Sequence, residues 1–257
     1  MTSYGPPQEQ AGHNFSIAYK AGVELPDLSA EAAKALTGAR RTIGRCLVVL
    51  ERNQGIDRVK GFAETYLGVP QEDFRSELPT ILNELRELKK KSESHLLLKI
   101  TNRLNMNGIM SETANGKVRF KNQSKNKFKK FAATSADRFE VEDRGVKGFK
   151  IIAHDGYTSN ITLRAGAFIE HRDIMSIIII HELTHKFLGY NDGYGGTWYF
   201  GADGNEQPDL GRAPHTMLRR TADGMAWFIA NVAGKMDHMD HLAINPPFGG
   251  CSACVLF

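Results

Sequence analysis

The chain has 257 residues, of which 41% are hydrophobic and 24% charged, and its formal net charge is +4. These values exclude a wholly disordered chain, because such chains combine few apolar residues with a large net charge. Three cysteines are too few for a disulfide framework. The length suits one large domain.

The first 26 residues predict a flexible N-terminal arm, because they contain Gly-Pro-Pro and show no apolar periodicity. They also lack the features of a secretory signal, and no run in the chain reaches the roughly 18 apolar residues of a membrane span. We therefore expect a cytoplasmic protein or one exported without a classical signal peptide. If the protein is delivered into a host cell, we expect it in the host-cell cytosol or at a membrane surface.

Three helices are predicted in the first hundred residues, from apolar residues at helical spacing over 27–52, 57–68 and 79–103. Cys46 lies in the first of them and is expected to be a buried free thiol. Beyond residue 103 the chain changes to short β-branched and aromatic stretches separated by Gly, Asn and Asp. They predict an antiparallel or mixed sheet with strands at 116–122, 138–143, 148–155 and 159–168.

The run 117–130 contains no acidic residue and could meet phosphates or an anionic membrane. A solvated loop or hairpin face is the simpler interpretation. The run is too short and too poor in aromatic residues for a nucleic-acid module, so no nucleic-acid partner is expected.

Helical character returns over 172–188 and 220–236, on either side of a Gly-rich loop at 189–211. Four consecutive isoleucines at 177–180 favour a strand by propensity alone. The free energy gained by burying an apolar helix outweighs the intrinsic cost of placing isoleucine in a helix, which is a few tenths of a kcal/mol per residue. The segment is therefore predicted to be a buried helix that carries the sequence His-Glu-Leu-Thr-His.

His181 and His185 stand four residues apart, which puts both imidazoles on one face of a helix, where they can bind one Zn²⁺. In a strand they would lie about 13 Å apart, too far for one ion. Glu182 would lie beside the metal and take a proton from its water. Asp192 is the favoured third ligand and His215 the fallback, while Glu206 lies in a Gly/Pro loop.

The chain resembles the deuterolysin and peptidyl-Lys metalloendopeptidase family, the aspzincins, over most of residues 28–235. Their His-Glu-x-x-His motif is followed by Gly-Thr-x-Asp-x-x-Tyr-Gly, and here the second element reads Gly-Tyr-Asn-Asp-Gly-Tyr-Gly at 189–195. The stretches at 63–68, 160–168 and 221–229 also look similar to family segments. The element at 189–195 departs from the family by a tyrosine in place of threonine and by one residue fewer.

This resemblance implies that His181, His185 and Asp192 bind zinc and that Glu182 activates the water. It also implies that Tyr194 supports the oxyanion and that Asp223 holds a histidine ligand in its tautomer. Because the loop is shorter, Tyr190 or Tyr199 could replace Tyr194. The alternative for Asp223 is a carboxylate on a helix surface.

The expected fold is a zincin-like α+β domain over 27–245, with a helical N-terminal half, a small mixed sheet and an active-site helix. The expected activity is zinc-dependent endopeptidase cleavage of a protein or peptide substrate, in the setting of a delivered effector or toxin. An inactive or metal-binding interaction protein and a peptidoglycan-type peptide hydrolase are the alternatives. The tail at 246–257 ends in a C-a-a-X box, and lipidation of Cys254 would add a membrane partner.

Overall fold

The computed structural model describes twelve stretches of the chain, and everything below refers to them: 4–10, 14–20, 28–53, 55–101, 110–113, 116–119, 132–135, 139–143, 150–154, 160–170, 172–190 and 215–234.

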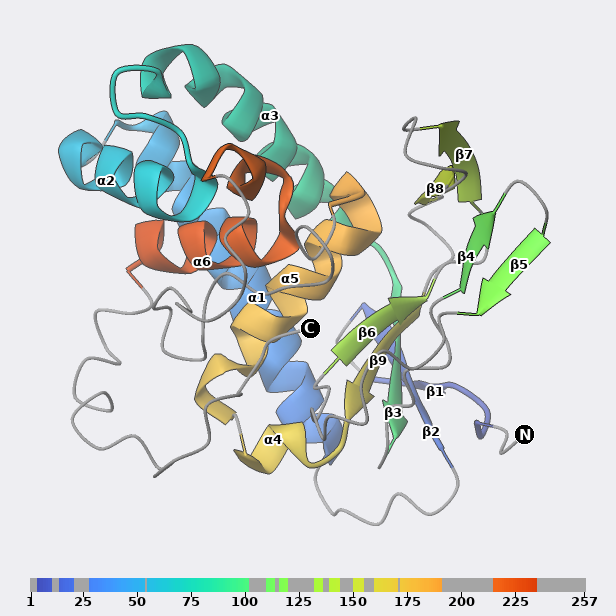
Figure 1. Cartoon of the computed structure of the whole chain (residues 1–257). Coiled ribbons are helices and arrows are strands. Elements are labelled where there is room, and N and C mark those ends of the chain that lie inside the picture. The colour runs from blue at the N-terminus through green and yellow to red at the C-terminus, as the bar shows by residue number, and fades with distance from the viewer. Residues whose placement is uncertain are drawn as a thin grey trace, which may run out of the picture.

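These stretches form an α+β fold in which helices and a sheet lie in separate layers (Figure 1). The helices are α1 (Leu28–Glu51), α2 (Ile56–Leu67), α3 (Phe74–Ser92), α4 (Ala167–Glu170), α5 (Met175–Leu188) and α6 (Ala222–Val232), with short 3-10 helices at Arg172–Ile174 and His215–Arg220. The strands are β1 (Gln8–Glu9), β2 (Phe15–Tyr19), β3 (Leu96–Thr101), β4 (Met110–Thr113), β5 (Gly116–Arg119), β6 (Ala132–Ser135), β7 (Phe139–Asp143), β8 (Lys150–His154) and β9 (Asn160–Arg164).

The main sheet is mixed, with the strand order β1-β2-β3-β9-β6. Strands β2, β3 and β9 are parallel to one another, whereas β1 and β6 pair antiparallel at the two sides. Strands β4 with β5 and β7 with β8 form two further antiparallel pairs. The expectation of a mixed sheet is confirmed. The ranges predicted from the sequence contain β9 of this sheet and the strands β5, β7 and β8 of the two antiparallel pairs, but not β2, β3 or β6.

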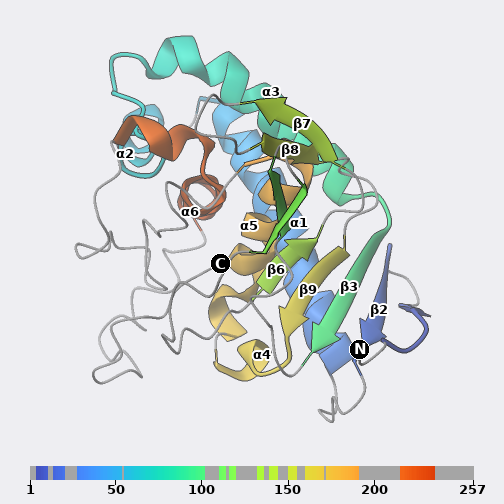
Figure 2. The same ribbon diagram turned by 45° about the vertical axis from the view of Figure 1, so that its right-hand side comes forward.

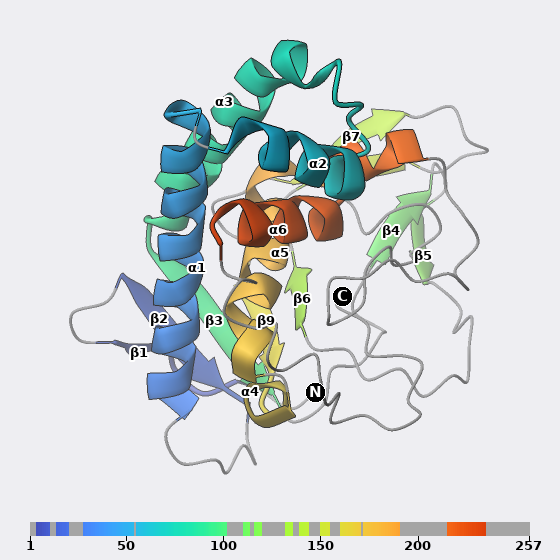
Figure 3. The same cartoon turned by 90° about the vertical axis from the view of Figure 1, so that its left-hand side faces the viewer.

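One face of the main sheet is covered by α1 and α5, which run across it behind the strands in Figure 2 and in front of them in Figure 3. The strand register aligns apolar side chains toward these helices. Ile17 pairs with Leu98 and Leu98 with Ile161, and none of the three is more than 1% exposed. Such rows of buried aliphatic side chains stabilise the helix layer on the sheet, by roughly 1.5–3 kcal/mol per fully buried side chain.

The expectation of a flexible arm over residues 1–26 is wrong for Phe15–Tyr19, which form the buried strand β2. Four of its five residues, Ser16 among them, are buried, so both faces of the strand are covered. Its partner in the parallel ladder is β3, about 80 residues away in sequence. Pairing between strands so far apart in the chain leaves no pattern in the residues near β2 from which it could be predicted.

The expected helix over 79–103 is also wrong in its second half, because α3 ends at Ser92 and Leu96–Thr101 form β3. The Leu-rich run at 96–98 continues the helical periodicity of α3, which made the two elements look like one. Tertiary contacts end the helix where propensity does not.

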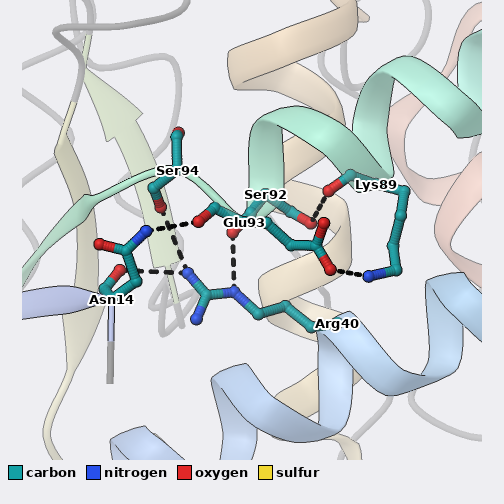
Figure 4. Close-up of polar contacts among 6 residues, drawn as sticks. All are labelled: Asn14, Arg40, Lys89, Ser92, Glu93 and Ser94. Carbon is teal, nitrogen blue, oxygen red and sulfur yellow. Dashed lines mark hydrogen bonds and ion pairs between the residues drawn. The ribbon is translucent and has the colours of Figure 1, made fainter. Parts of the chain in front are cut away.

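Figure 4 shows these contacts at the end of α3. The Arg40 guanidinium of α1 donates to the carbonyl oxygen of Ser92 at 2.7 Å, and to those of Ser94 at 3.3 Å and Asn14 at 3.2 Å. The Asn14 side chain donates to the carbonyl of Glu93. Arg40 therefore satisfies the Ser92 carbonyl, which the end of α3 leaves without an intrahelical partner. Its bonds also tie α3 to α1 and to Asn14, directly before β2.

Helices α1, α2, α5 and α6 lie where the sequence places them, whereas α4 begins inside the strand predicted over 159–168. Cys46 is a free thiol that is fully buried in α1. Burial raises the pKa of the Cys46 thiol and keeps it protonated. None of the helices within the described ranges has both the length and the apolar character needed to cross a membrane.

Candidate metal centre

Helix α5 carries the His-Glu-Leu-Thr-His sequence and lies beside α1 over the main sheet, in contact with α6. Its four consecutive isoleucines, Ile177–Ile180, are each 0% exposed. Each buried isoleucine contributes roughly 1.5–3 kcal/mol, which outweighs its small intrinsic preference for a strand. The expected buried helix is confirmed, and the 3-10 turn Arg172–Ile174 leads into it.

Two imidazoles converge on this helix. The Nε2 atoms of His181 and His185 lie 3.0 Å apart, and the two rings are nearly perpendicular at 80°. Two nitrogen ligands at about 2.05 Å from a tetrahedral zinc would be separated by about 3.3 Å. The pair therefore needs to open by only a few tenths of an ångström to hold one ion.

The far side of each imidazole faces an oxygen acceptor. His185 Nδ1 donates a hydrogen bond to the carbonyl oxygen of Tyr190, since a carbonyl can only accept. His181 Nδ1 lies 3.8 Å from Oδ1 of Asp223, a carboxylate that favours a proton on that nitrogen. The 3.0 Å contact between the two Nε2 atoms is a hydrogen bond in the metal-free chain, and a cation that binds both Nε2 atoms would replace its proton.

Asp223 is held in the first turn of α6, and it is 1% exposed. Thr221 caps this helix by accepting a hydrogen bond from the backbone N–H of Gly224 at 3.1 Å. The absence of a side chain at Gly224 allows α6 to approach α2, because a Cβ there would lie 2.3 Å from the carbonyl oxygen of Tyr66. The alternative of a surface carboxylate does not describe Asp223, which lies in the core beside His181.

Glu182 follows His181 on the same turn and is 0% exposed. Asp192 and Tyr194 lie outside the described residues, as do Tyr199 and Glu206, and His215 opens the 3-10 helix His215–Arg220. Within the part of the chain that is described, no three His, Cys, Asp or Glu side chains are arranged to hold a metal ion. The described donors are therefore the two histidines of α5.

The chain reverses at the end of α5 because Gly189 adopts the left-handed conformation, with φ of 66°. This reversal brings the Tyr190 carbonyl back to His185. The Tyr190 side chain is buried, and its hydroxyl accepts a hydrogen bond from Nη1 of Arg219 at 2.9 Å. Burial, together with Glu84, raises the pKa of Tyr190 although Arg219 opposes the shift.

Sequence reasoning missed the contribution of Arg219 and of the Tyr190 carbonyl to this site. The sequence also did not indicate that Lys186, which directly follows His185, is buried at 3% exposure. A lysine after a metal motif is usually read as a solvated charge, and a backbone carbonyl has no sequence signature. The Gly189 helix stop was the one available signal that the chain returns toward His185.

Comparison of the chain with protein-family models, with curated proteins and with solved structures found no match.

Proposed function

We propose that this chain is a zinc-dependent endopeptidase with a zincin-like fold of the aspzincin kind. The observation that carries the proposal is the 3.0 Å approach of the His181 and His185 Nε2 atoms on one helix, with an acceptor oxygen behind each ring. Two imidazoles that are oriented in this way suit zinc, for which neutral Nε2 is a common ligand atom.

The zinc ligands in this proposal are His181, His185 and Asp192. Asp192 follows the Gly189 reversal by three residues, and this short spacing is the reason for proposing it as the third ligand. Three protein ligands leave one position for water, as catalytic zinc sites require. Bound zinc supplies Lewis-acid chemistry, in that it acidifies a coordinated water and polarises a peptide carbonyl.

The remaining roles belong to side chains of the chain. Glu182 takes the proton of the attacking water and delivers it to the leaving amine, so that one carboxylate serves as base and then as acid. Tyr194 donates to the developing oxyanion. Asp223 keeps the proton of His181 on Nδ1, which leaves Nε2 available for the metal.

The proposed substrate is a protein, and the proposed setting is that of a delivered effector or toxin. A metal-binding interaction protein without activity and a hydrolase of cell-wall peptides remain the competing functions. Cleavage assays on proteins and on cell-wall peptides, run side by side, separate these from the endopeptidase.

We expect the purified zinc-loaded chain to cleave peptide bonds in a proteome digest, to lose this activity with a zinc chelator, and to regain it when zinc is restored. New peptide termini in the digest are counted by mass spectrometry, beside a parallel assay on peptidoglycan stem peptides. Cleavage of the stem peptides alone would mean that the substrate is a cell-wall peptide and not a protein. Absence of cleavage in both assays, with zinc retained, would favour the interaction protein.

A further inference from the structure

Arg219 makes three polar side-chain contacts in a partly buried cluster with Tyr190, Glu84 and Glu77, the Arg219 cluster. Its side chain is 16% exposed; Nη1 donates to the Tyr190 hydroxyl at 2.9 Å, Nη2 lies 2.8 Å from Oε2 of Glu84, and Nε lies 3.4 Å from Oε2 of Glu77. Arg219 thus holds both the Tyr190 hydroxyl and the Glu84 carboxylate.

This cluster connects three elements. Glu77 and Glu84 belong to α3, Arg219 belongs to the 3-10 helix before α6, and Tyr190 directly follows the Gly189 stop of α5. A planar guanidinium can meet three acceptors in fixed directions, which a lysine ammonium on a flexible chain does not do.

The orientation of His185 depends on a residue that this cluster fixes. The Tyr190 hydroxyl is held by Arg219, while the carbonyl of the same residue accepts the proton of His185 Nδ1. Arg219 therefore restrains the hydrogen-bond partner of the His185 ring.

We infer that Arg219 is a positioning residue that sets the orientation of His185 through Tyr190. The effect of Arg219 on zinc binding rests on the proposed function. The effect of Arg219 on the orientation of the His185 ring does not, because that orientation is a property of the metal-free chain. The effect of Arg219 on His185 passes through Tyr190, whose hydroxyl Arg219 holds and whose carbonyl accepts from His185 Nδ1.

The test compares Arg219→Gln and Tyr190→Phe with wild type, using Arg40→Gln as the matched control. Arg40 is also a partly buried arginine with three acceptors and ties α3 to its neighbours, but it lies at the other end of α3. All variants are measured only as folded protein, as judged by near-ultraviolet circular dichroism, so that a general loss of stability does not count as an effect on the site.

The first readout is the His185 tautomer in the metal-free protein, from long-range ¹H–¹⁵N spectra at about pH 8, above the ordinary imidazole pKa of about 6.5. Wild type and Arg40→Gln should hold the proton on Nδ1, whereas Arg219→Gln and Tyr190→Phe should show a mixture of the two tautomers. An Nδ1 tautomer that is unchanged in both cluster variants would overturn the inference.

The second readout is zinc affinity by chelator competition, with the visible spectrum of the cobalt-substituted protein. Arg219→Gln should weaken zinc binding about tenfold, in line with losses of positioning partners at metal sites, and the double variant should bind no more weakly than Arg219→Gln alone. An equal loss in Arg40→Gln would contradict a specific role. If wild type binds no zinc while the tautomer still depends on Arg219, the proposed function fails and the positioning role stands.

Discussion

Glu182→Gln is expected to lower kcat for peptide cleavage by about 10²–10⁴-fold while leaving zinc bound. Loss of a positioned general base has an effect of this size, and an amide cannot accept the proton of the attacking water. Glutamine has nearly the same shape as glutamate, which matters because Glu182 is 0% exposed. The measurements are kcat on a peptide substrate and the zinc content of the purified variant, determined by elemental mass spectrometry.

His95→Gln provides a control for this substitution, because His95 is an exposed side chain whose Nε2 lies 2.8 Å from the Ser16 hydroxyl at the sheet. We expect kcat to be unchanged there. If Glu182→Gln kept full activity with zinc in place, the general base would have to be another group and the proposed mechanism would be wrong.

Gly224→Ala is expected to destabilise the protein by about 3 kcal/mol, the upper part of the range for overpacked cores. The added methyl would lie 2.3 Å from the Tyr66 carbonyl oxygen, 2.8 Å from Thr221 Oγ1 and 3.1 Å from the Leu218 carbonyl. Two of these atoms belong to the backbone, so the clash is relieved only if α6 moves away from α2. Urea unfolding followed by circular dichroism measures the change.

Gly61→Ala is the matched comparison, since Gly61 lies inside α2 and a Cβ there meets nothing within 4 Å. Alanine should stabilise that helix by about 0.5–1 kcal/mol, because glycine loses more backbone entropy on folding. A Gly224→Ala protein as stable as wild type would mean that α6 does not approach α2 as closely as 2.3 Å implies.

The elements that could be predicted are those with local periodicity. Helix α1 and strand β9 carry their pattern within a few residues, and α5 could be predicted because burial of Ile177–Ile180 decides against strand propensity. Strand β2 could not be predicted, because its register is set by pairing with β3 across the helices between them. The end of α3 could not be predicted either, since Arg40 in α1 provides the cap.

The candidate site divides in the same way. The spacing of His181 and His185 fixes their common face, because four residues make about one helical turn. The burial of Asp223 beside His181 follows from α6 packing against α2. From the sequence, a role for Asp223 could be predicted only through the resemblance to a family. The Tyr190 carbonyl and the Arg219 cluster depend on where the chain goes after Gly189, which no spacing rule specifies.

Zinc stoichiometry of the folded chain tests the central claim most directly, namely that His181 and His185 bind one ion. After loading with zinc and exhaustive dialysis, we predict one zinc per wild-type chain, about none in His181→Ala and His185→Ala, and a weakened site in Asp192→Ala. Wild-type protein that retains no more zinc than the His185→Ala variant would contradict the account.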